Sequence, residues 1–339
     1  MTKGKAGKVL GFVISAVSRR VTRRLPAQVK RVCVAAMAWL ALVVAACTPP
    51  DRSAEVRHLQ AEIAKMPGVD DVNPLYTNDF ENGAQLSLVV AMPKASEEQI
   101  AAVGSRITRI KGGDFNGYRQ STTFVVGDRL EVTRGAELNP AQIAGDTHRL
   151  RELRTRVPQA AILWSRDGAT VRLEVSDIDH TSDVLSAVLA TVQPEPMTVY
   201  VRSAEPTKFP TWEVGIPITA EQRANIDTLI SRLALPIYYV RVDDARITAL
   251  SVYITDPATA YRDLKSVIST IAPTKQHPLQ LQWHLMVEPD NFHQFTGDLQ
   301  VPDCRDDSGS PKPQAPQGNQ TAAAAELQRQ LASDFNDCR

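Results

Sequence analysis

The sequence lacks the motifs from which catalytic function is usually inferred. It contains no Gly-x-Ser-x-Gly, His-Glu-x-x-His, Gly-x-x-x-x-Gly-Lys or Cys-x-x-Cys pattern. These patterns mark serine hydrolases, zinc proteases, P-loop nucleotide hydrolases and dithiol redox sites. The six histidines are scattered along the chain. We therefore expect a protein that is not an enzyme and that has no catalytic residues, no cofactor and no metal ion. An exported enzyme with an unrecognised site is the alternative.

Acidic residues are missing from the first 46 positions, which carry nine basic side chains. Positions 47–339 hold the remaining 29 basic side chains and all 38 acidic ones, so their net charge is −9. A negatively charged protein is poorly suited to binding a phosphate backbone, so we expect no nucleic-acid partner.

Long apolar runs are also missing. The longest candidate, residues 32–46, covers about 15 positions, whereas a membrane-spanning helix needs about 20. It follows Lys30 and Arg31 and ends in small residues, which is the layout of an export signal over residues 1–46. The 31 residues before the run are long for such a signal and favour a later start, for example at Val29. A plain membrane anchor is the alternative, and either arrangement places the rest of the chain outside the cytoplasmic membrane.

Cysteine is scarce, with four residues at positions 33, 47, 304 and 338. Cys47 directly follows Val44-Ala45-Ala46, and this pattern resembles the lipobox of bacterial lipoproteins. The resemblance implies cleavage after Ala46 and a diacylglycerol thioether on Cys47, with palmitate as a typical acyl chain. The protein would then be lipid-anchored at the extracytoplasmic face of the cell membrane. The alanine-rich composition, with more arginine than lysine, is typical of high-GC bacteria such as actinobacteria.

Cys304 and Cys338 flank a polar segment near the end of the chain. Because exported proteins can form disulfides, these two residues could be bridged, and two free thiols are the alternative. Residues 289–339 are rich in Asp, Ser, Pro, Gln and Gly, which predicts a disordered tail. One short helix is expected within it, over residues 321–335.

Between the linker 47–53 and this tail, one order of elements recurs with a period near 80 residues. Helix, strand, strand, helix and strand are expected in each of the segments 54–134, 135–205 and 206–288. Two helices can cover only one face of such a sheet. The predicted fold class is therefore α+β, with three tandem αββαβ two-layer sandwich units.

Local signals set several of the expected boundaries. Ser96 with Gln99 has the spacing of a capping box, and Asn139-Pro140 has that of a cap followed by a first-turn proline. A single strand is expected over 122–132 and a short strand-like stretch over 211–216. The last helix of the third unit is expected to start at Asp256-Pro257.

The αββαβ order over residues 52–287 resembles the BON domain, a small module found in exported bacterial proteins. The resemblance rests on the order of elements and not on a residue motif. It implies a tandem array of small α+β modules.

Aromatic residues make up only 6% of the chain, yet they gather in the third unit. A ligand groove is predicted there, and the alternative is that the same residues form a well-packed core. Alternation along the strand would place Tyr238 and Tyr239 on opposite faces. The groove would be lined by Trp212, Tyr239, Tyr253 and Trp283.

Two acidic stretches offer weak metal-binding signals. Residues 177–183 form the densest polar cluster, but they are better interpreted as a loop that caps a helix through Asp179 or Thr181. Asp243-Asp244 is better interpreted as a hairpin turn.

The functional hypothesis is a membrane-anchored lipoprotein of the cell envelope that acts as a non-catalytic binding or scaffolding module. Its partners would be the membrane, through the lipid on Cys47, and an envelope protein or a cell-wall polymer. An exported carrier or sensor of a small ligand is the alternative.

Overall fold

The computed structural model describes residues 50–79, 81–192, 195–286, 295–302 and 320–335. Within these residues the chain is a mixed α/β protein with seven helices and a single sheet of twelve strands. The helices are α3 (Ser53–Ile63), α4 (Glu97–Lys111), α5 (Pro140–Arg156), α6 (Thr181–Thr191), α7 (Ala220–Ser231), α8 (Ala260–Ile271) and α9 (Ala322–Phe335). The strands are β1 (Asp71–Asp79), β2 (Gly83–Ala91), β3 (Arg119–Gly127), β4 (Leu130–Arg134), β5 (Ala161–Asp167), β6 (Thr170–Ile178), β7 (Met197–Ser203), β8 (Thr211–Ile216), β9 (Ile237–Asp243), β10 (Arg246–Ile254), β11 (Leu279–Leu285) and β12 (Thr296–Val301).

The strands lie in the sheet in the order in which they occur in the chain. Each odd-numbered strand pairs antiparallel with the next strand, as β1 does with β2. Each even-numbered strand pairs parallel with the next, as β2 does with β3, and a helix makes that connection. The repeating element is therefore a hairpin followed by a helix. Successive hairpins begin 36 to 48 residues apart, which is about half of the period that the sequence suggested.

The sheet is continuous across the boundaries predicted between units. β4 pairs in parallel with β5 across the first boundary, and β7 pairs antiparallel with β8 across the second. The mixture of helices and strands is confirmed, but strand pairing does not separate the chain into three sheets. The single strand expected over 122–132 is wrong. The chain turns at Asp128-Arg129, where Arg129 has a φ of 55°, and makes the β3–β4 hairpin.

Two further expectations about the chain's C-terminal part have different outcomes. The expected short helix is present as α9. The segment 289–339 was expected to be disordered apart from this helix, and this is wrong for residues 296–301, where β12 pairs with β11 and α9 packs against β12. Leu299 and Val301 on β12 are buried together with Leu327 and Leu331 on α9, and this apolar contact fixes both elements to the sheet.

Helix capping follows the sequence in some places and not in others. Ser96 and Gln99 form the predicted capping box, and Asn139 caps α5 ahead of Pro140. The cap predicted for α6 is wrong, because His180 occupies the cap position in a left-handed conformation. The start predicted for α8 is also wrong, since residues 256–259 form a turn and the helix begins at Ala260.

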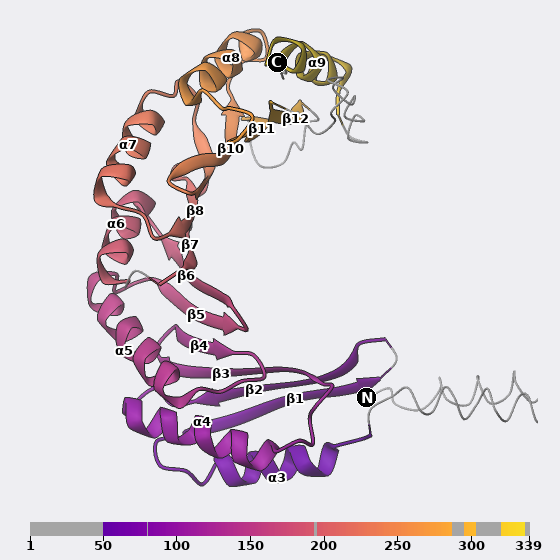
Figure 1. Ribbon diagram of the computed structural model, residues 1–339, viewed down its shortest axis with the longest axis vertical. Helices are drawn as coiled ribbons and strands as arrows, with labels where there is room; N and C mark the ends of the chain where they lie inside the picture. Colours follow the sequence, from indigo (N-terminus) through magenta and orange to yellow (C-terminus); the bar gives the residue numbers. More distant parts are fainter. Residues whose placement is uncertain (1–49, 80, 193–194, 287–294, 303–319, 336–339) are drawn as a thin grey trace, which may run out of the picture.

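The molecule is an arc, with the helices along the convex side and the sheet along the inside (Figure 1). The helices lie along one side of the sheet, and the sheet bends away from them (Figure 1). This gives the sheet a concave face. Among the described residues, no helix lies on that face in Figure 1.

The core lies between the helices and the sheet and holds the largest buried side chains, including Trp164, Trp212 and Trp283. One polar cluster is buried there as well. Asp146 on α5 accepts hydrogen bonds from Arg134 on β4 at 2.6 Å and from Arg166 on β5 at 2.6 and 3.0 Å. Arg134 and Asp146 are each 2% exposed. We call these three residues the buried ion cluster, and it fastens α5 to the sheet.

Candidate functional site on the concave face

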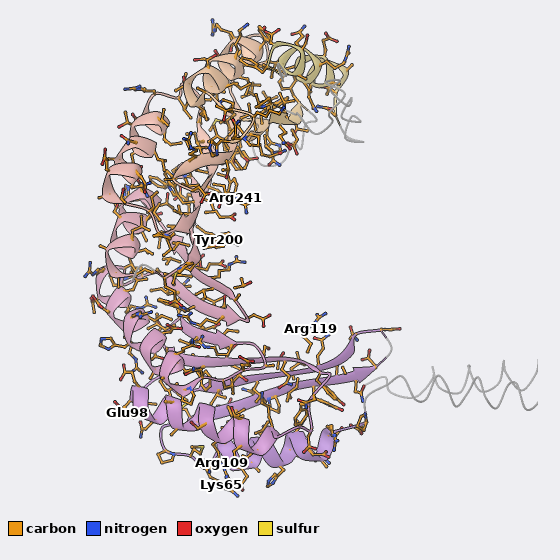
Figure 2. All side chains as sticks on the ribbon, viewed as in Figure 1. Lys65, Glu98, Arg109, Arg119, Tyr200 and Arg241 are labelled. Carbon is orange, nitrogen blue, oxygen red and sulfur yellow. The ribbon has the colours of Figure 1, made fainter. Side chains whose placement is uncertain are left out.

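Strand alternation decides which side chains reach the concave face. On β6, Val171, Leu173 and Val175 are buried under the helices, so Arg172 and Glu174 point to the opposite face. Side chains of Arg119, Tyr200 and Arg241 project toward the inside of the arc, whereas Lys65, Glu98 and Arg109 lie on the helix side (Figure 2).

Tyr200 on β7 forms the centre of the first group of side chains. The Arg172 guanidinium lies 3.9 Å from the centre of its ring, and that of Arg202 lies 5.8 Å away. Glu174 holds both arginines, at 2.8 Å from Arg172 and 3.0 Å from Arg202. The shared carboxylate keeps both guanidinium groups beside the ring, where cation–π attraction stabilises them.

The same pattern continues on β8 and β9. Glu213, which is 7% exposed, accepts a hydrogen bond from the Tyr239 hydroxyl and lies 3.2 Å from Arg241. Arg241 also contacts Asp243 at 3.1 Å. Burial together with the neighbouring Glu213 carboxylate raises the pKa of Tyr239, so its hydroxyl remains a hydrogen-bond donor.

We call these side chains the arginine–tyrosine ladder. Its three arginines and three carboxylates balance, so it carries no net charge. Each charged group has a fixed partner, and this limits the conformational entropy that the ladder would lose on binding. The ladder consists of Arg172, Glu174, Tyr200, Arg202, Glu213, Tyr239, Arg241 and Asp243.

A second group lies on β9 to β12. The rings of Tyr238 and Tyr253 are 4.8 Å apart, and that of His284 is 5.5 Å from Tyr238. Beside these rings, the Gln282 amide lies 3.3 Å from the Ser251 hydroxyl and 3.4 Å from the Asp298 carboxylate. Gln280 also donates a hydrogen bond to Asp298. We call Tyr238, Ser251, Tyr253, Gln280, Gln282, His284 and Asp298 the amide–aromatic patch.

A hollow of about 530 Å³ adjoins this patch. It is formed where β9, β10, β11 and β12 meet the segment before β11. Polar side chains make up most of its lining, which comprises Arg241, Asp243, Asp244, Thr248, Ala249, Gln276, His277, Pro278, Gln280 and Gln300.

The four residues of the predicted aromatic groove are divided between the two faces of the sheet. Tyr239 belongs to the ladder and Tyr253 to the amide–aromatic patch. Trp212 and Trp283 are only 2% and 0% exposed and lie in the core under the helices. For these two tryptophans the core alternative is therefore correct, since buried indoles cannot line an open groove.

The expectation that Tyr238 and Tyr239 face opposite ways is wrong. The pairing of β9 with β10 shifts between Ser251 and Val252, which marks a bulge or irregularity. A bulge adds a residue to one strand and changes the direction of the side chains next to it. Tyr238 consequently contacts Tyr253 and His284, while Tyr239 bonds Glu213, and both lie on the concave face.

The polar and charged members of the face were not identified from the sequence. Their signal was present as polar residues at every second position of strands such as β11, where Gln280, Gln282 and His284 alternate with buried residues. Alternation alone is typical of any sheet with one open face, so it did not single out these positions.

Neither acidic stretch gathers metal ligands. In the described part of the chain there is no group of three or more His, Cys, Asp or Glu residues able to hold a metal ion. Asp177 pairs with Arg129 instead. Asp244 and Ala245 occupy the predicted hairpin turn with φ of 49° and 57°, the conformation of a tight two-residue turn.

The residues on which the lipid and disulfide predictions depend, Cys47, Cys304 and Cys338, lie outside the described residues. Among the helices of the described segments, none is both long enough and apolar enough to cross a membrane. Comparison with known proteins gave no match to a family model, to a curated protein or to a solved structure.

Proposed function

We propose that this protein is a lipid-anchored module of the cell envelope that binds a partner on its concave face and has no catalytic role. One observation carries the proposal: the arc presents a sheet face that no helix of the described segments covers, on which arginine and tyrosine side chains are held in place by ion pairs. Arginine and tyrosine are enriched among the residues that contribute most to protein binding interfaces.

The shape supports the proposal as well. Proteins built from stacked repeats commonly use an extended concave surface to bind their partners. We further propose that the two layers extend over the whole described length, with the three αββαβ segments as related building units akin to BON domains. The lipid on Cys47 would hold the arc at the extracytoplasmic face of the membrane, where an envelope protein or cell-wall polymer can reach it.

We also propose, for a physical reason, that the protein has no catalytic role. The carboxylates of the ladder are engaged by arginines at 2.8 to 3.2 Å. Their oxygens are therefore already engaged within the protein. A small-ligand carrier is the second candidate, favoured by a separate hollow of about 300 Å³ where α7 and α8 meet the β9–β10 turn.

Photo-crosslinking in intact cells tests the proposal. A benzophenone side chain would be placed at Arg119, Tyr200 or Arg241 on the concave face, and at Lys65, Glu98 or Arg109 on the helix side as matched controls (Figure 2). We expect adducts of high mass from the concave positions only. Equal labelling from both sets, or labelling from the helix side alone, would contradict the proposal.

The lipid anchor has its own test. Mass spectrometry of the mature protein should show cleavage before Cys47 and a diacylglyceryl group on that residue. An unmodified Cys47 with the leader attached would remove the anchor from the proposal and leave the concave-face binding to be judged by crosslinking.

A further inference from the structure

The amide–aromatic patch and the adjoining hollow combine two kinds of surface that a sugar needs. Tyr238, Tyr253 and His284 form a cluster of rings with centres 4.8 and 5.5 Å apart. Aromatic faces attract the C–H groups of a pyranose ring, which lie on its two flat sides. The hydroxyl groups around the edge of the sugar need partners that both donate and accept hydrogen bonds.

The glutamines beside the rings are partners of this kind, because each amide has two donor hydrogens and an acceptor oxygen. Gln280 and Gln282 are oriented by Asp298, and Gln282 is also oriented by Ser251 at 3.3 Å. Gln276 lines the hollow near them. Fixing the amides in this way lowers the conformational entropy that they lose when a ligand binds.

The charges decide between uncharged and anionic ligands. Asp243, Asp244 and Asp298 lie in or beside the hollow with Arg241 as the balancing cation, so the local formal charge is negative. Arg241 is already held by Asp243 at 3.1 Å. A phosphate-rich or uronic-acid ligand would meet repulsion here, whereas an uncharged hydroxyl-bearing ligand would not.

An extended peptide strand fits this surface less well. A peptide that adds to a sheet does so through free backbone groups at an edge strand. The strands β9, β10 and β11 have neighbours on both sides, so their backbone groups are used within the sheet. Binding on this face therefore depends on side chains, and the side chains present suit a sugar.

We propose that the amide–aromatic patch and its hollow bind an uncharged oligosaccharide, with Tyr253 and Tyr238 contacting the flat side of a sugar ring and Gln280 and Gln282 bonding its hydroxyl groups. The hollow, at about 530 Å³, lies within the range of volumes of small-molecule sites. This inference rests on the proposed function, because it names the class of partner for one end of the concave face.

The test uses the purified chain on an array of uncharged oligosaccharides, including β-1,4-linked glucose and N-acetylglucosamine oligomers, with polygalacturonate and hyaluronate as anionic probes. The strongest array ligand is then titrated calorimetrically. Tyr253→Ala should weaken its binding about tenfold or more, because it removes the aromatic face that contacts the sugar ring; tenfold corresponds to about 1.4 kcal/mol. Gln282→Leu, which keeps the approximate size, should weaken it by a similar factor.

Arg109→Ala is the control, because Arg109 lies on α4 at the helix side, outside both groups of concave side chains (Figure 2). It should leave oligosaccharide affinity within about twofold of the parent, and circular dichroism should show that each variant is folded. Failure of every uncharged probe, preference for an anionic probe, or equal loss in Arg109→Ala and Tyr253→Ala would overturn the inference. Concave-face crosslinking to a protein, combined with no glycan binding, would overturn the inference while the proposed function stands.

Discussion

Neutralising Asp146 is expected to destabilise the middle of the arc more than any surface substitution. Its carboxylate is 2% exposed and receives hydrogen bonds from Arg134 and Arg166 at 2.6 to 3.0 Å. Asp146→Asn keeps the shape of the side chain but removes its charge. Arg134 then remains buried with neutral acceptors only, namely the carbonyl oxygens of Thr133 and Gln142 at 2.8 and 3.3 Å and the amide oxygen of the substituted side chain.

The expected loss in the free energy of unfolding depends on the Arg134 guanidinium, which stays buried without its anionic partner. Removing one partner of a buried ion pair costs about 3–5 kcal/mol, because the remaining charge is left uncompensated. Loss of solvation already lowers the pKa of Arg134 to about 10, while Asp146 acts in the opposite direction and stabilises its charged form. Arg166 keeps Glu195 as a partner, so we expect a loss of about 3 kcal/mol, the lower end of this range.

Urea unfolding followed by tryptophan fluorescence and circular dichroism measures this loss. The fluorescence of Trp164 reports directly on the buried ion cluster, because the guanidinium groups of Arg149 and Arg166 lie 5.7 and 5.8 Å from the centre of its ring. The control is Glu152→Gln on the same helix, whose carboxylate is 47% exposed and pairs with Arg156. This control substitution should lower the free energy of unfolding by no more than about 0.5 kcal/mol. Equal midpoints for Asp146→Asn and the parent chain would refute the reasoning.

Other substitutions give further expected outcomes. A methyl group on Gly297 would lie 2.0 Å from the Trp283 ring, whereas one on Gly145 within α5 would meet no atom within 4 Å. Thermal unfolding should therefore show that Gly297→Ala destabilises the chain and that Gly145→Ala stabilises it by about 0.5–1 kcal/mol; stabilisation by both would contradict the packing. Loss of solvation lowers the pKa of His284 below 6.5. The imidazole of His284 therefore binds a proton more readily in the unfolded chain than in the folded chain. The free energy of unfolding should consequently fall as the pH drops below about 6.5. Urea midpoints at pH 7.5 and 5.5 should differ less in His284→Gln than in the parent, and an unchanged difference would refute this assignment.

Short-range signals in the sequence predicted the helices and three of the six hairpins of the described residues, β1–β2, β5–β6 and β9–β10. The capping box at Ser96 and the cap at Asn139 were recognisable because each depends on residues within one helical turn. The β3–β4 hairpin was missed because its turn at Asp128-Arg129 interrupts an otherwise apolar and β-branched run. That omission hid the hairpin-and-helix repeat and doubled the apparent period.

The continuous sheet and the composition of the concave face depend on long-range pairing. The parallel contact of β4 with β5 joins residues on opposite sides of α5, and no local pattern indicates it. Tyr239 and Tyr253 were predicted as ligand-facing, but nothing in their spacing distinguished them from the core residues Trp212 and Trp283. The bulge that turns Tyr238 onto the concave face is likewise a property of the paired strands and not of one strand alone.

The central claim, that a partner occupies the concave face, is tested most directly by hydroxyl-radical footprinting of intact cells against the purified chain. Tyr200, Tyr239 and Tyr253 lie on that face, and Tyr261 on α8 is a comparably half-buried reference on the helix side. The account predicts that oxidation of the three concave tyrosines falls severalfold in cells while that of Tyr261 stays unchanged. Equal oxidation of the concave tyrosines in cells and in purified protein would contradict it.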